Sequence, residues 1–117
     1  MQRTDEAPWT NPTMNVVSYV NPKRDDVRLR VEFRKHRRRI LEFVVQIEFL
    51  RDDEWVPVVR YDTAHGVAHR DSYAADRSVS RHEPLPETDF NRALTLAEKE
   101  CNRHWRKWVG RFRRLRS

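Results

Sequence analysis

The chain has 117 residues, with 24 Lys and Arg against 18 Asp and Glu, which gives a net charge of +6. This length fits one domain, and 38% hydrophobic residues are enough for a compact core. One cysteine excludes an intramolecular disulfide and a multi-cysteine zinc site, and two glycines exclude Gly-rich phosphate loops. No apolar run matches a membrane span or a secretory signal. We expect a cytoplasmic protein with an acidic partner, no cofactor and no membrane contact.

Residues 1–26 are polar, contain three prolines and show no sustained period. This pattern predicts a polar N-terminal arm with at most a short strand at residues 15–20, held by a partner or by a sheet edge if it is ordered. Residues 27–117 are expected to form a single α+β domain.

Four strands are predicted in that domain, at residues 27–34, 39–50, 54–62 and 67–73. In the first two, every odd position is apolar from Val27 to Phe33 and from Leu41 to Phe49, so odd residues should face the core and pair with one another. Such pairing needs an odd loop or a bulge. Asp52-Asp53 predicts a tight turn, and Pro57 requires an edge or a bulge. Residues 74–83 read as a polar loop.

The C-terminal segment is the clearest element. Apolar residues recur at steps of three and four, which predicts a helix at residues 89–114 capped by Thr88 or Asp89. Cys101, Trp105 and Trp108 lie on this stripe and are expected in the core. The predicted fold is an antiparallel four-stranded meander packed against one long C-terminal helix.

The densest group of chemically active side chains lies at residues 60–71. A hairpin between the third and fourth strands, with Asp62 opposite Val67 and Arg60 opposite His69, would place four of them on one face. These four are Arg60, Asp62, His69 and Asp71, with Tyr61 on the other face and His65 in the turn. Histidine can transfer a proton, aspartate can orient it, and arginine can stabilise a phosphate. The catalytic prediction covers all six residues.

Two other interpretations of this segment stay open. The simplest is an ion-paired strand end with surface histidines. Metal binding by His65 and His69 is disfavoured, because four residues along an extended strand would separate them by about 13 Å. The register around Pro57 is also open, since the opposite register would place Tyr61 in the core and both Arg60 and Asp62 on the solvent face.

The last turns of the helix are strongly basic and predict nucleic-acid contacts outside the apolar stripe. The predicted contact residues are Arg103, Arg106, Lys107, Arg111, Arg113 and Arg114. The alternative is an ordinary solvated helix face whose cations suit the helix dipole. A second basic cluster, at residues 28–39, could extend a phosphate track or protect a sheet edge.

The segment RYDTAHG at residues 60–66, followed by His69, resembles the RYDNAxH…H signature of TumE-type toxins and related small prokaryotic domains. The layout of residues 27–115 is similar too. The resemblance implies a toxin that acts on RNA, an antitoxin partner, and roles for Arg60, Tyr61, Asp62, His65 and His69. The chain departs from the signature at Thr63, where asparagine is usual, and it lacks a denser histidine run.

Three hypotheses follow. The first is a small nucleic-acid-directed protein, RNA before DNA, acting as a toxin-like, metal-independent ribonuclease. The second is a non-catalytic nucleic-acid-binding module. The third is an interaction subunit that docks on an acidic antitoxin or a larger complex.

Overall fold

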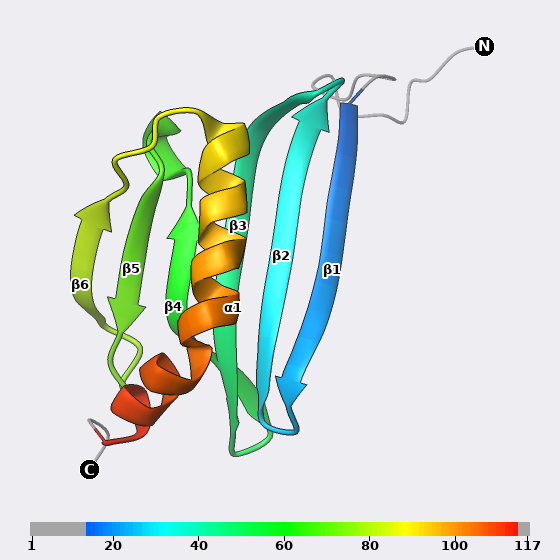
Figure 1. The fold of residues 1–117 in the computed structure, drawn as a ribbon. Coiled ribbons are helices and arrows are strands. Elements are labelled where there is room, and N and C mark those ends of the chain that lie inside the picture. Colours follow the sequence, from blue (N-terminus) through cyan, green and yellow to red (C-terminus); the bar gives the residue numbers. More distant parts are fainter. Residues whose placement is uncertain (1–13, 115–117) are drawn as a thin grey trace, which may run out of the picture.

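A computed structural model describes residues 14–114, which form an antiparallel sheet of six strands in sequential order and one helix (Figure 1). The elements are β1 (Met14–Arg24), β2 (Val27–His36), β3 (Arg39–Arg51), β4 (Glu54–Asp62), the short 3₁₀ turn η1 (Ala64–Gly66), β5 (His69–Tyr73), β6 (Val79–Pro84) and α1 (Phe90–Arg114). The α+β class and the C-terminal helix are confirmed. The predicted four-stranded meander is wrong, because the sheet has two further strands.

Both additional strands lie at the edges of the sheet. β1 pairs with β2 along ten positions, so residues 14–24 of the predicted arm belong to the sheet, and the rest of that arm up to residue 13 lies outside the described residues. β6 pairs with β5 and occupies part of the predicted loop at residues 74–83. Edge strands bury few side chains, and every β6 residue except Glu83 is exposed. The sequences of β1 and β6 therefore lack the apolar alternation that identifies an inner strand.

The core lies between α1 and one face of the sheet, which we call the helix face. Val27, Leu29 and Val31 on β2 pair with Phe49, Ile47 and Val45 on β3, and all six are buried. The predicted odd-to-odd pairing is confirmed. It is made possible by a bulge that leaves Leu41 without a partner on β2, and Leu41 is exposed.

A second bulge sets the register of β4 against β3. Asp52 and Asp53 both have positive φ, which forms the expected tight turn. The register then shifts between the pairs Glu48–Pro57 and Ile47–Val59, so that Val58 is an additional residue. Pro57 has no N–H to donate and lies beside this bulge, as predicted. The shift decides which side chains of residues 59–62 face the core.

Helix α1 lies across β3 and β4 (Figure 1). The backbone N–H of Arg92 donates to the carboxylate of Asp89 at 3.1 Å, which confirms Asp89 as a cap. Cys101, Trp105 and Trp108 are buried on the sheet side, as predicted. The described part of the chain contains no helix whose length and hydrophobicity would let it cross a bilayer.

Candidate functional site

The hairpin of β4 and β5 brings the predicted polar residues together in a different register. Asp62 pairs with His69 and Arg60 with Asp71, so the predicted pairs Asp62–Val67 and Arg60–His69 are wrong by two residues. The loop is longer than predicted because η1 intervenes. A shift of two residues preserves the face of every side chain. Arg60, Asp62, His69 and Asp71 therefore share the face opposite α1, which we call the open face.

Four side chains form a compact group on the open face, here called the His–Asp cluster: Asp62, His69, Asp71 and His82. The Nε2 atom of His69 lies 2.7 Å from Oδ1 of Asp62 and 3.9 Å from Oδ2 of Asp71. The Nδ1 atom of His82 lies 2.5 Å from Oδ1 of Asp71. The two imidazole rings have centroids 4.7 Å apart. The cluster therefore alternates histidine and carboxylate across three strands.

Asp62 is the most constrained member of the cluster. Its Oδ2 accepts a hydrogen bond from Nε of Arg60 at 2.7 Å, and its Oδ1 accepts one from the backbone N–H of Ala64 at 3.2 Å. His69 is also fixed, because it is only 8% exposed and its Nδ1 lies 3.1 Å from the carbonyl oxygen of Val67. Both ring nitrogens of His69 thus face protein acceptors, so His69 is not positioned to contact a substrate first.

His82 is the member that the sequence analysis missed. It lies opposite Asp71 on β6, and 58% of its side-chain surface is exposed. Directly opposed residues on antiparallel strands have Cβ atoms about 5 Å apart, so pairing alone brings these side chains into contact. Residues 74–83 were predicted as a loop, and without a strand there was no reason to place His82 beside Asp71.

Tyr61 does not belong to this group. It is fully buried on the helix face, and its hydroxyl donates a hydrogen bond to Glu100 of α1. Burial, followed by the hydrogen bond to Glu100, raises the pKa of Tyr61 far above its ordinary value. The guanidinium of Arg70 lies over the rings of both Tyr61 and Trp108. These surroundings of Tyr61 are those of a core residue, on the face of the sheet opposite the His–Asp cluster.

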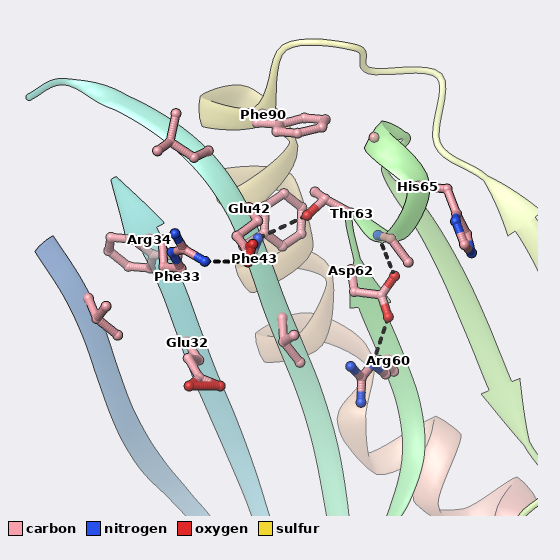
Figure 2. Close-up of a pocket in the computed structure, with 15 residues that line it drawn as sticks. Glu32, Phe33, Arg34, Glu42, Phe43, Arg60, Asp62, Thr63, His65 and Phe90 are labelled. Atoms are coloured by element: carbon pink, nitrogen blue, oxygen red, sulfur yellow. Dashed lines mark hydrogen bonds and ion pairs between the residues drawn. The ribbon is translucent and has the colours of Figure 1, made fainter. Parts of the chain in front are cut away.

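His65 lies outside the cluster as well. It is exposed on η1 with a φ of 61°, and Figure 2 shows its ring directed away from Thr63 and Phe43. Its partner in the predicted motif, His69, is on β5 and points into the open face. The structure therefore brings together four of the six predicted catalytic residues and leaves out Tyr61 and His65.

A pocket of about 570 Å³ adjoins the cluster at Asp62 and is also lined by Arg60 (Figure 2). It forms where β3 continues past the end of β4, so that the backbone N–H of Phe43 donates to Oγ1 of Thr63 instead of to a strand partner. Phe90 lines it from the start of α1. Its lining is mixed, with the aromatic rings of Phe33, Phe43 and Phe90 beside the charged groups of Glu32, Arg34, Glu42, Arg60 and Asp62.

A second charged network lies on the open face beside the cluster. Glu48 is 5% exposed and accepts hydrogen bonds from Nε of Arg28 at 2.7 Å, from Nε of Arg30 at 3.0 Å and from Gln46 at 2.5 Å. Burial alone would raise the pKa of Glu48, but these hydrogen bonds lower it below its ordinary value. Arg28 and Arg30 are therefore used in structural ion pairs with Glu48.

The predicted nucleic-acid residues lie elsewhere on the molecule. All six basic residues are exposed on α1, and we call them the basic helix face: Arg103, Arg106, Lys107, Arg111, Arg113 and Arg114. At 3.6 residues per turn they span an arc of about 160° opposite the buried stripe. Since α1 covers the helix face of the sheet, this basic surface and the His–Asp cluster lie on opposite sides of the sheet.

The fold and the cluster together define a class: a single α+β domain whose sheet carries a helix on one face and a polar group on the other. The chain belongs to the family described as a domain of unknown function (DUF7718), whose model matches residues 4–117. That description names no activity and does not mention TumE-type toxins, so the toxin resemblance stays a sequence prediction. No curated protein and no solved structure is detectably similar to this chain.

Proposed function

We propose that this protein is a non-catalytic nucleic-acid-binding module that contacts phosphates through the basic helix face. The observation that carries the proposal is the sorting of charges between sheet and helix. Of the nine arginines on the described strands, seven form ion pairs with carboxylates, as Arg60 does with Asp62 and Arg70 with Glu83, and the exceptions are Arg39 and Arg51. Among residues 14–114, five cations of the basic helix face have no carboxylate partner: Arg103, Arg106, Lys107, Arg111 and Arg113.

Unpaired cations on a rigid helix suit a polyanion. Each phosphate contact releases counterions, and this release dominates non-specific binding to nucleic acid. Two of the cations are also held in place: Arg106 lies 4.6 Å from the ring centroid of Trp105, and Arg113 lies 5.8 Å from that of Phe49. Holding a side chain in one position reduces the entropy lost on binding. RNA is proposed before DNA because of the toxin resemblance, and a cytoplasmic location belongs to the same proposal.

A ribonuclease is the alternative, and it rests on the His–Asp cluster. RNA bound along the basic helix face would have the sheet between it and the cluster of the same molecule. A catalytic function would therefore need a different RNA-binding surface or a second copy. An acidic antitoxin is a further alternative ligand for the same basic surface, since it offers carboxylates in place of phosphates.

The test is a matched pair of triple variants. Arg103→Gln/Lys107→Gln/Arg111→Gln removes three charges from the basic helix face. Lys35→Gln/Arg38→Gln/Arg39→Gln removes the same charge near the β2–β3 turn. Binding to a single-stranded RNA and to duplex DNA is measured across salt concentrations. The helix variant should lower the slope of log affinity against log salt by about two, since each phosphate contact contributes about 0.7.

Equal losses in both variants would show that net charge alone drives binding, and binding that does not depend on salt would exclude the proposal. Incubation of wild-type protein with the same RNA tests the alternative. Cleavage that disappears in His69→Gln and persists in the helix variant would favour the ribonuclease over the binding module.

A further inference from the structure

The His–Asp cluster contains three ligand atoms that converge on one point. One atom each from His69, Asp71 and His82 lies within 4.8 Å of the other two. The convergence follows from sheet geometry. Asp71 and His82 are directly opposed on β5 and β6, and His69 lies two residues before Asp71, on the same face of β5. Ligands from two paired strands are positioned by the backbone hydrogen bonds between them.

The two ring nitrogens of His69 have different partners. Nδ1 lies 3.1 Å from the carbonyl oxygen of Val67, which can only accept, so this contact is a hydrogen bond in the tautomer that carries its proton on Nδ1. In that tautomer Nε2 carries a lone pair, and this atom faces the carboxylates of Asp62 and Asp71. Three acceptors facing one another repel unless a cation or a proton lies between them. Metal-binding histidines commonly donate their second nitrogen to a backbone carbonyl in this way.

The net charge of the side chains around this point is negative, which favours a bound cation. Asp62 and Asp71 supply two negative charges, and Arg60 is the guanidinium bonded to Asp62. The distance of 2.5 Å between Asp71 and His82 is a little shorter than the roughly 3 Å between neighbouring ligands on a metal with bonds of about 2.0–2.1 Å. His82 is largely exposed, so a bound ion would keep positions open to water.

We propose that Nε2 of His69, the carboxylate of Asp71 and Nδ1 of His82 bind one divalent transition-metal ion, of which Zn²⁺ is the reference case. Two imidazoles and one carboxylate select such ions over Mg²⁺ and Ca²⁺, which prefer oxygen ligands. Asp62 lies beside the site, where its hydrogen bonds with Arg60 and Ala64 hold it close to His69. The site is on the open face and is independent of the proposed nucleic-acid surface.

The test uses the full-length protein without an affinity tag, after treatment with a chelator. Zn²⁺ binding is measured by calorimetry, and Co²⁺ binding by its visible absorption. We expect one ion per chain. His82→Gln should weaken binding by about tenfold or more, and its folding is not at risk because His82 is exposed on an edge strand. Asp71→Asn should have a comparable effect, and His65→Gln is the matched control that should bind like wild type.

Three outcomes would overturn the proposal. They are no stoichiometric binding of either ion by the wild type, equal affinity in wild type and His82→Gln, and a loss of binding in His65→Gln. None of these outcomes bears on nucleic-acid binding through the basic helix face, so the metal proposal can fail while the nucleic-acid proposal stands.

Discussion

Tyr61 and Asp62 are consecutive residues whose side chains lie on opposite faces of the sheet. Tyr61 is fully buried against α1, and Asp62 belongs to the His–Asp cluster. One motif thus supplies a core residue and a polar site residue, and changes at the two positions should have different consequences.

Tyr61→Phe should reduce the free energy of unfolding slightly and leave the binding of RNA and of Zn²⁺ unchanged. The variant loses the hydrogen bond to Glu100 but keeps the packing against Trp108, whose ring centroid lies 6.4 Å from that of Tyr61. Because Glu100 is partly exposed and regains water, the loss in the free energy of unfolding should be about 1 kcal/mol. Urea unfolding measures it. Tyr73→Phe, which removes a hydroxyl with no hydrogen bond among residues 14–114, should stay within about 0.5 kcal/mol of wild type.

The orientation of Tyr61 also shows where sequence reasoning stops. Periodicity predicts α1 and the inner strands because each buries a regular apolar stripe. It does not predict the bulge at Val58, which reverses the face of every residue up to Asp62. Pro57 indicates that a bulge is needed nearby but does not fix its position at Val58, which places both Val56 and Val59 in the core.

The site was predicted in part for a related reason. The β4–β5 register differs from the predicted one by two residues, and such a shift keeps every side chain on its face of the sheet. The error in loop length therefore did not separate the four predicted residues Arg60, Asp62, His69 and Asp71. His82 depends on β6, whose residues are almost all exposed. Pairing with β5 organises that strand, and such pairing leaves no apolar signal in the sequence.

Glu48→Gln should destabilise the protein in a pH-dependent way. The pKa of Glu48 in the folded protein lies below its ordinary value of 4.5, so its ion pairs add stability above that pH. This contribution is lost as the pH falls through the folded-state pKa. At neutral pH the free energy of unfolding of the variant should be about 2 kcal/mol lower than that of wild type, and this difference should shrink in acid.

Urea unfolding at neutral pH and at about pH 3 tests the sign. Glu32→Gln is the control, because Glu32 is exposed and lies 3.6 Å from Arg30. Its effect should be about 0.5 kcal/mol or less at both pH values. A Glu48→Gln effect that grows in acid would contradict the assignment of the lowered pKa.

Cys101 should be unreactive until the protein unfolds. It is fully buried under α1, and this burial, reinforced by Glu100 and Glu98, raises the pKa of its thiol. Thiolate is the reactive form, so both access and ionisation oppose alkylation. Native protein should react at least about a thousandfold more slowly than protein in denaturant, in proportion to the unfolded population. Lys99→Cys in a Cys101→Ala background places a thiol at an exposed position of the same helix and should react rapidly without denaturant.

His65→Gly should stabilise the protein. His65 has a φ of 61°, a conformation that glycine adopts readily and that costs other residues about 1 kcal/mol. Relief of this strain should outweigh the greater flexibility of glycine in the unfolded chain and raise the free energy of unfolding by about 0.5 kcal/mol. Gly66→Ala is the matched opposite. Its φ is 77° and its added Cβ meets nothing within 4 Å, so the strain alone should cost about 1 kcal/mol. Thermal unfolding of both variants measures the difference. A lower stability would show that the flexibility of glycine outweighs the strain, and a loss of RNA binding would show that His65 makes a contact that its exposed position on η1 does not explain.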